Sequence, residues 1–303
     1  MSACTNTESL FAPDSKLKEN PVSLNESANE SPTPSQPNPS PVRSPQNSTI
    51  QSVTQTPTPE QSEPPQLPSG ETLEVSTVEE APEQLRPYVK DVADLGILMA
   101  SEGNETDAKA EFNPNEPITR RDFARWLVTA NNKLYANQPG QQIRLVKEAD
   151  TPAFQDVSQN DPDFAVIQGL AEAGLIPSRL TGDSTKVLFR PDAPLNREDL
   201  VLWKVPLDRR QGLPNASIES VKETWGFQDT AKVDPKVLSA LLADFENGEQ
   251  SNIRRVFGYT TIFQPDKPVT RAEAVATLWY FGTAGEGISA EEALEIQDNQ
   301  NQP

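Results

Sequence analysis

One segment, Phe112-Asn-Pro-Asn-Glu-Pro-Ile-Thr-Arg-Arg-Asp-Phe123, recurs twice further along the chain. The later copies are Phe189-Arg-Pro-Asp-Ala-Pro-Leu-Asn-Arg-Glu-Asp-Leu200 and Phe263-Gln-Pro-Asp-Lys-Pro-Val-Thr-Arg-Ala-Glu-Ala274. All three share a phenylalanine, two prolines, an apolar residue before Thr or Asn, an arginine and an acid at the same spacing. Such self-similarity is the signature of a repeat protein, in which each unit buries its apolar face against its neighbours.

Each copy predicts an extended arm followed by a helix. The helix starts are marked by a capping residue with an acid three residues later: Thr119, Asn196 and Thr270. The proline two residues before each cap keeps the chain extended up to that point. Apolar residues then recur at helical spacing, as at Phe123 and Leu127, and predict a buried face. Pro206 is expected to end the middle helix early.

A second helix is expected ahead of each arm. Phe154-Gln-Asp-Val157 and Phe227-Gln-Asp-Thr230 each lead into an Asp-Pro pair, which is a helix-start signal. The helices that follow are expected at 163–175 and 236–245. The first copy offers 83–98 instead and lacks the Phe-x-Asp lead. One such helix pair cannot bury its own apolar face, whereas three packed together can.

These patterns predict a mainly α fold behind a long tail. The expected parts are a tether at 1–81, repeats at 82–145, 146–218 and 219–283, and a polar C-terminal tail at 284–303. The segment Ser31-Pro-Thr-Pro-Ser-Gln-Pro-Asn-Pro-Ser-Pro41 is nearly pure proline and polar residues. It has too few apolar side chains to offset the entropy of ordering, so we expect a disordered Pro/Ser-rich tether.

The composition excludes several classes of function. The net charge of −19 argues against nucleic-acid binding and against polybasic docking on a membrane. The chain has no histidine, which excludes Ser-His-Asp triads and HExxH zinc sites. Its one cysteine, Cys4, excludes an internal disulfide. Helix capping explains the acids of the repeats, so we expect a protein that is not an enzyme and uses no cofactor.

Three pentapeptides resemble the Ile-Thr-Arg-Ala-Glu-like motif of the S-layer homology family: Ile118-Thr-Arg-Arg-Asp122, Leu195-Asn-Arg-Glu-Asp199 and Val269-Thr-Arg-Ala-Glu273. Gly96 and Gly174 match the family's helix ends. The resemblance covers residues 82–283. It implies a pseudo-threefold assembly whose grooves, between repeats, bind cell-wall polysaccharide linked to peptidoglycan. The repeats carry inserts at 134–153 and 247–261, and such long repeats behind a Pro-rich tether resemble those of cyanobacteria and other two-membrane bacteria.

The resemblance implies that the motif arginines contribute to glycan binding. A cation in the first turn opposes the helix dipole, whereas a helix N-terminus bearing arginine suits a carboxylate or phosphate. The alternative is that each arginine pairs with a repeat acid such as Asp156 or Asp229 and links the units. We expect Trp126 and Trp203 to pack in the core rather than stack on sugars. The candidate glycan-binding residues are Arg120, Arg197, Arg271, Thr119, Thr270, Glu273 and Trp225.

The start of the chain suggests a lipid anchor. Met1-Ser-Ala-Cys4 resembles the end of a bacterial lipobox, whose cysteine becomes the lipidated first residue of the mature protein. No charged or apolar segment precedes it, so a lipid at Cys4 requires a gene start further upstream. We therefore expect a non-catalytic module of the cell envelope, in the periplasm or at the cell surface, that binds peptidoglycan-linked polysaccharide. The alternative is an envelope protein–protein adaptor that has lost glycan binding.

Overall fold

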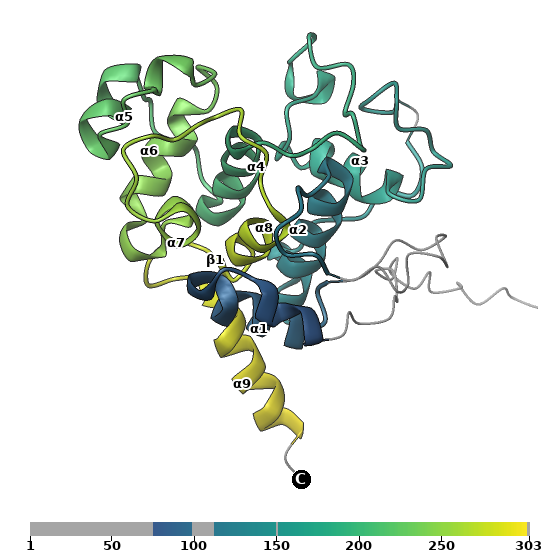
Figure 1. Ribbon diagram of the computed structural model, residues 1–303. Coiled ribbons are helices and arrows are strands. Elements are labelled where there is room, and N and C mark those ends of the chain that lie inside the picture. The colour runs from purple at the N-terminus through teal and green to yellow at the C-terminus, as the bar shows by residue number, and fades with distance from the viewer. Residues whose placement is uncertain (1–74, 99–111, 150, 302–303) are drawn as a thin grey trace, which may run out of the picture. The chain divides into compact units, whose positions relative to one another are not determined.

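The computed structural model describes residues 75–98, 112–149 and 151–301 (Figure 1). This part of the chain is mainly helical, as predicted, with one short antiparallel hairpin. No helix within it is long and apolar enough to cross a membrane. Cys4 and the predicted tether up to residue 74 lie outside the described residues. Val78 and Ala81 are already buried, so the packed part begins slightly ahead of the expected boundary at 82.

Most of the longer helices lie within the three segments expected as repeats, with short elements around them. η1 (Val75–Glu80) lies just ahead of the first expected repeat, which contains η2 (Glu83–Leu85), α1 (Arg86–Asp94), α2 (Arg120–Leu134) and η3 (Pro139–Gln141). The second contains α3 (Phe164–Glu172), η4 (Arg179–Thr181) and α4 (Arg197–Arg209). The third contains α5 (Ile218–Trp225), η5 (Thr230–Lys232), α6 (Leu238–Glu246), η6 (Gly248–Gln250), α7 (Asn252–Phe257) and α8 (Arg271–Thr277).

The chain ends in a hairpin and one more helix. Strands β1 (Tyr280–Phe281) and β2 (Ile288–Ser289) pair antiparallel, and α9 (Ala290–Asn301) follows directly. Ala290 and Ala293 of α9 are buried, and α9 packs against α1. The segment expected as a polar tail therefore contributes part of its length to the packed structure.

The predicted helix caps are confirmed. Thr119, Asn196 and Thr270 each accept a hydrogen bond from the backbone N–H three residues later. The full reciprocal box forms only at Thr270, where the Glu273 carboxylate accepts the Thr270 N–H at 2.8 Å. Gly96 and Gly174 lie just after the C-terminal ends of α1 and α3, with φ of 64° and 74°. This left-handed conformation ends a helix and favours glycine, as expected.

The three arms form a closed ring of backbone hydrogen bonds. The N–H of Ile118 donates to Val269 O at 3.0 Å, and the N–H of Val269 donates to Leu195 O at 2.9 Å. The N–H of Leu195 then donates to Ile118 O at 2.9 Å. All three side chains are fully buried, and α2, α4 and α8 all start at this ring (Figure 1). The arms therefore meet in the cyclic arrangement that a pseudo-threefold assembly requires.

The Phe-x-Asp leads position the arms of the second and third repeats. Asp156 accepts the N–H groups of Phe189 and Arg190 at 2.8 and 2.7 Å. Asp229 accepts those of Phe263 and Gln264 at 2.9 and 2.7 Å. Arg190 and Gln264 have φ of 58° and 56°, which costs a non-glycine residue about 1 kcal/mol. The two carboxylates offset this cost and fix the start of each arm.

The expectation for Pro206 is wrong. Helix α4 continues past Pro206 to Arg209. Proline removes one helical hydrogen bond and costs about 3 kcal/mol inside a helix. The residues that follow, Leu207 and Asp208, are both buried, so packing of the last turn outweighs this local cost.

Candidate functional site

The motif arginines lie at the junctions between repeats. Arg120 donates through Nε to Phe189 O at 2.7 Å and forms an ion pair with Asp199. Arg197 donates to Phe263 O at 3.0 Å and pairs with Glu273 at 3.4 Å. Each arginine thus reaches from its own helix start to the arm and the capping acid of the next repeat.

The third arginine links the third repeat back to the first. Arg271 pairs with Asp122 of the first repeat at 3.4 Å. Its guanidinium lies 4.7 Å from the Trp126 ring centroid, and that of Arg120 lies 4.7 Å from the ring of Trp203. Cation–π contacts of this kind contribute about 0.5–2 kcal/mol each. Trp126 and Trp203 are buried, so the expectation that they pack in the core is confirmed.

These contacts correct one part of the sequence analysis. The arginines do link neighbouring repeats, but their partners are not Asp156 and Asp229. Those two aspartates bind backbone N–H groups of the arms instead. The partners are the acids three residues after the cap of the next motif helix, namely Asp122, Asp199 and Glu273. The same acid therefore marks a helix start and receives an arginine from the preceding repeat.

The three arginines differ in exposure. The side chain of Arg197 is 8% exposed, compared with 18% for Arg120 and 20% for Arg271. Burial lowers the pKa of the Arg271 guanidinium, and the Asp122 carboxylate opposes this effect. The Nε atoms of Arg197 and Arg271 are buried without a hydrogen-bond partner among the described residues. A buried unsatisfied donor costs about 1–3 kcal/mol, so each of these two junctions carries a local cost.

The third junction differs from the other two in the polarity of the residue that follows the motif arginine. Arg121 forms ion pairs with Asp161, Asp163 and Asp192 of the second repeat. Glu198 accepts the backbone N–H of Asp234 in the third repeat at 3.2 Å. The corresponding residue beside Arg271 is Ala272, which has no polar group. The third and first repeats are therefore joined with fewer polar side chains at this position.

The junction at Arg120 is tightly filled. A cavity of about 40 Å³ there is lined by Arg120, Asp199, Leu188 and Lys236, among others. This volume holds a water molecule or two and is too small for a sugar ring. A ligand could reach Arg120 only from the rim of this cavity.

The other candidate residues are held by the fold. The hydroxyls of Thr119 and Thr270 accept the capping hydrogen bonds, and Glu273 both closes its capping box and receives Arg197. The Trp225 indole N–H donates to Leu241 O at 2.8 Å, and its ring stacks on Phe227 at 5.2 Å. Trp225 therefore packs within the third repeat and does not join the motif arginines.

Two buried charge clusters were missed by the sequence analysis. Arg125 binds Asp163 through two hydrogen bonds of 2.9 Å. Lys204 is fully buried, forms an ion pair with Asp208 and donates to Tyr280 O at 2.8 Å. In the sequence, a charged residue on an otherwise apolar helix face is the pattern that could have indicated each cluster. No group of His, Cys, Asp and Glu that could hold a metal ion is present within 75–98, 112–149 and 151–301.

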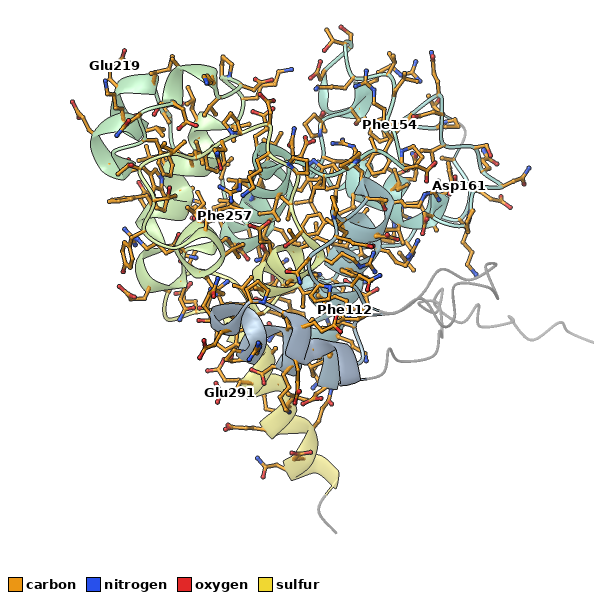
Figure 2. All side chains as sticks on the ribbon, in the orientation of Figure 1. Phe112, Phe154, Asp161, Glu219, Phe257 and Glu291 are labelled. Carbon is orange, nitrogen blue, oxygen red and sulfur yellow. The ribbon has the colours of Figure 1, made fainter. Side chains whose placement is uncertain are left out.

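Figure 2 shows how densely the side chains fill the described part of the chain, from Phe112 in the first arm to Phe257 in α7. The Phe257 ring lies under the Arg197 guanidinium at 3.9 Å from its centroid. Asp161, also labelled there, receives Arg121. Taken with the ring of arms, these contacts define a helical repeat protein whose units are linked by arginines that are largely covered by their neighbours.

Comparison with known families identifies the first of these units. Residues 78–124 match the family model of the S-layer homology domain, so this segment is an S-layer homology domain. It spans α1, the first arm and the start of α2. Domains of this family are non-catalytic modules that anchor proteins at the cell wall, and the chain therefore carries a module of the cell envelope. No curated protein matches the chain.

Proposed function

We propose that the three repeats form one non-catalytic module that binds peptidoglycan-linked polysaccharide and tethers the protein to the wall. The observation that carries this proposal is the junction of the third and first repeats. Its Arg271 belongs to the motif closest to the family pattern and contacts Asp122, which lies inside the matched segment. The accessible fifth of the Arg271 side chain suits an anionic oxygen of a glycan.

The three arginines are not equal candidates. Arg271 and Arg120 keep about a fifth of their side chains accessible, whereas Arg197 is nearly buried between Phe257 and Glu273. We assign the main role to Arg271 and a secondary role to Arg120. Thr119, Thr270 and Glu273 support the site by fixing the helix starts, and Trp225 supports it only through the packing of the third repeat.

Binding to purified peptidoglycan sacculi, with and without their attached polysaccharide, tests the proposal. We expect the full chain to be retained only by sacculi that carry the polysaccharide. Arg271→Ala should weaken retention by about 1.5–3 kcal/mol, the range for a charged hydrogen bond. Arg271→Lys should restore only part of it, because lysine lacks the planar fork. Arg209→Ala is the control, since Arg209 pairs with Glu246 and is not a motif arginine.

Asp122→Asn separates binding from folding. It removes the charge that pairs with Arg271 and with Arg125 but leaves Arg271 in place. If Arg271 only joins repeats, Arg271→Ala and Asp122→Asn should lower the melting temperature alike and leave retention of the folded protein intact. If Arg271→Ala loses retention on the sacculi and Asp122→Asn keeps it, the result supports a role of Arg271 in glycan binding. Unchanged retention of folded Arg271→Ala contradicts it.

A protein–protein adaptor is the second candidate function. It is favoured by the Arg120 junction, where the guanidinium is bound by Phe189 O and Asp199 and the adjoining cavity is too small for a sugar. An adaptor should fail to bind sacculi of either kind.

We also propose that Cys4 carries a lipid that attaches the protein to a membrane, with the module in the periplasm or at the cell surface. The Ser-Ala-Cys junction and the polar segment after it support this proposal. Mass spectrometry of the N-terminal peptide, after expression from the extended gene, tests it. An unmodified peptide would contradict the lipid anchor.

A further inference from the structure

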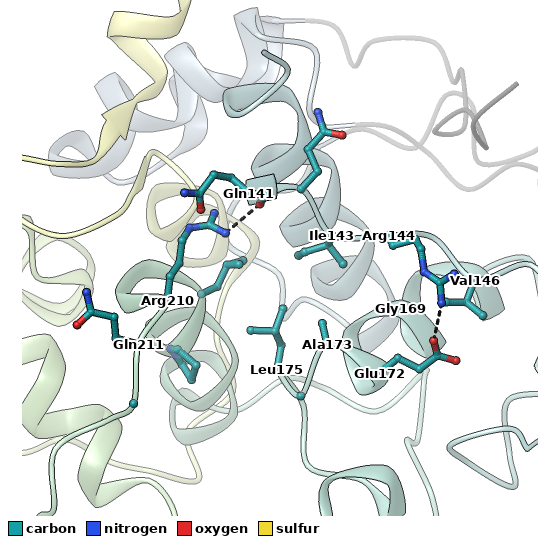
Figure 3. Close-up of a pocket in the computed structure, with 15 residues that line it drawn as sticks. Gln141, Ile143, Arg144, Val146, Gly169, Glu172, Ala173, Leu175, Arg210 and Gln211 are labelled. Atoms are coloured by element: carbon teal, nitrogen blue, oxygen red, sulfur yellow. Dashed lines mark hydrogen bonds and ion pairs between the residues drawn. The ribbon is translucent and has the colours of Figure 1, made fainter. Parts of the chain in front are cut away.

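Lys204 of α4 is fully enclosed by protein. Its Nζ donates to Tyr280 O at 2.8 Å and lies 4.0 Å from the centroid of the Phe281 ring. Figure 3 shows the opposite case at the groove of about 680 Å³ near the end of α4, where Arg144 is 79% exposed in its ion pair with Glu172. Water hydrates that surface charge, whereas the charge of Lys204 has lost its hydration.

One carboxylate joins this lysine to a side-chain amide. Lys204 forms an ion pair with Asp208 Oδ1, and Asn252 Nδ2 donates to Asp208 Oδ2 at 2.9 Å. Asp208 and Asn252 are also buried. Since the two nitrogens bind the two oxygens of the same group, the amine and the amide lie next to each other. They come from different repeats, because Lys204 is on α4 and Asn252 begins α7.

Burial favours the uncharged forms of the lysine and the aspartate. It lowers the pKa of Lys204 from 10.5 to about 8 and raises the pKa of Asp208, although the charge of each residue opposes the shift of the other. A proton that passes from Lys204 to Asp208 leaves a neutral amine beside a neutral carboxylic acid. A neutral, desolvated amine is a nucleophile, and the acid beside it can move protons during the reaction.

The Asn252 amide is positioned to receive such a nucleophile. Arg255 donates to its carbonyl oxygen, Oδ1, at 3.4 Å. A cation at this oxygen stabilises the negative charge that the oxygen gains when an amine adds to the carbon. The Asp244 carboxylate accepts both the backbone N–H and the Nδ2 of Asn252 at 2.9 Å. These contacts fix the orientation of the amide, which favours reaction with a neighbouring group.

A cavity lies beside this cluster. Its volume is about 300 Å³, and its lining includes Asp208, Asp244 and Thr283. Ammonia is about as large as a water molecule, so the cavity has room for it. A nitrogen released from Asn252 can therefore leave the cluster while the chain stays folded.

We propose that Lys204 and Asn252 form an isopeptide bond, a covalent amide between their side chains, within the folded protein. The neutral Nζ of Lys204 attacks Cγ of Asn252, and a C–N bond forms. Asp208 gives its proton to Nδ2 and takes one from Nζ, the Cγ–Nδ2 bond breaks, and ammonia leaves. Asp208 returns to its starting state, so the reaction needs no oxidant and no second substrate.

The bond would join the second and third repeats covalently, since it closes the chain from α4 to α7 into a loop. A module that holds a protein at the cell wall gains resistance to pulling from such a link. The inference does not depend on glycan binding, because none of its residues is a motif residue. In linked chains Lys204 is an amide, so this lysine titrates only in chains where the bond has not formed.

Tryptic digestion of the full chain, followed by tandem mass spectrometry, tests the proposal. The bond blocks cleavage after Lys204 and joins the peptide 198–209 to the peptide 237–254. We expect this branched peptide from the natural chain, with the loss of one ammonia, about 17 Da. Succinimide formation at Asn247-Gly248 also releases ammonia, so the branched peptide, and not the intact mass, identifies the bond.

Three variants assign the roles. Lys204→Met removes the nucleophile at similar volume and should abolish the branched peptide. Asp208→Asn keeps the shape of the side chain but cannot carry the proton, so it should slow linkage at least about hundredfold. Lys236→Met is the matched control, because Lys236 pairs with Asp183 in a half-exposed ion pair, and it should link as the natural chain does. Circular dichroism establishes that the variants compared are folded.

The natural chain decides the proposal whether or not the variants fold. A branched peptide that joins Lys204 to Asn252 supports it. If the natural chain yields only separate peptides, the proposal is overturned. A bond from Lys204 to Asp208, which releases water, about 18 Da, and leaves the peptide 237–254 free, overturns the assignment of Asn252. Linkage of folded Asp208→Asn at the natural rate would overturn the role of Asp208 as proton carrier.

Discussion

The side chain of Asp163 joins two repeats through buried charge. It accepts two hydrogen bonds from Arg125 and one from Arg121, both of the first repeat. Arg125 also donates to Asp122, which receives Arg271 of the third repeat. One chain of ion pairs therefore runs through all three repeats. A buried charge that loses its partner is strongly destabilising, because desolvation is no longer compensated.

We expect Asp163→Asn to lower the free energy of unfolding by about 3–5 kcal/mol, because it leaves the buried Arg125 without its main counterion. The matched control is Asp192→Asn. Asp192 also pairs with Arg121, but its side chain is 81% exposed, so the loss should stay below about 1 kcal/mol. Urea denaturation of both variants checks the difference. Equal losses would show that the buried part of the cluster contributes no more than the exposed part.

Lys204 predicts a pH dependence of stability. Burial lowers its pKa from 10.5 to about 8, although the neighbouring Asp208 carboxylate raises it. The unfolded chain keeps this proton up to the ordinary pKa, so between the two values the unfolded state binds more protons. Stability contributed by this group should therefore rise with pH from about 8 to about 10.5. Below this window, the folded state keeps the full penalty of the buried charge.

The double variant Lys204→Met/Asp208→Asn provides the reference, because it removes both titrating groups while keeping similar volumes. The difference in free energy of unfolding between the natural chain and this variant should shift in favour of the natural chain between about pH 7.5 and about pH 10. Urea titrations at several pH values measure it. A constant difference would mean that Lys204 keeps its ordinary pKa in the folded state.

At the scale of single elements, the sequence predicted what depends on local chemistry. Thr119, Asn196 and Thr270 begin their helices, because a capping residue and its acid lie within one turn of each other. The effect of Pro206 was predicted wrongly, since the burial of Leu207 and Asp208 lies outside any local rule. The insert at 134–153 is visible in the sequence as extra length, but nothing in its residues indicates that it packs on α3.

At Gly169, the insert packs closely against α3. A Cβ on this residue would lie 2.3 Å from Arg144 O, a backbone atom. Alanine is the better helix former by about 1 kcal/mol, yet the clash should outweigh this gain. We expect Gly169→Ala to destabilise the protein by about 1–3 kcal/mol, as overpacking does. Gly140→Ala is the control, because nothing lies within 4 Å of its added Cβ. Thermal unfolding compares them, and a neutral Gly169→Ala would mean that the insert moves away freely.

At the scale of the whole molecule, the repeats depend on a ring that no single repeat contains. The sequence predicted three units and their arms, but not which arm donates to which. The backbone order runs from Ile118 to Val269, from Val269 to Leu195 and back to Ile118. The arginines donate around the ring in the opposite sense, from the first repeat to the second, the second to the third and the third to the first. Their acids could therefore be assigned only once the order of the repeats in space was known. Pairing across a ring is non-local, which is why spacing within one repeat could not identify Asp199 as the partner of Arg120.

The closed ring predicts that the three repeats unfold as one. Deleting residues 227–281 removes the third arm, and with it the acceptor for the Ile118 N–H and the donor to Leu195 O. It also removes Glu273, which binds Arg197, and Arg271, which binds Asp122. In addition, it uncovers apolar side chains of both remaining repeats. Each unpaired buried backbone group costs about 1–3 kcal/mol, and a domain is stable by only about 5–15 kcal/mol, so the remainder should not fold.

Removing residues 290–303 instead leaves the ring intact and should lower the melting temperature while keeping one sharp transition. Circular dichroism during heating, combined with light scattering to establish the monomer, distinguishes the two truncations. A monomeric, sharply melting chain without residues 227–281 would show that two repeats are stable alone and that closure of the ring is not required for folding.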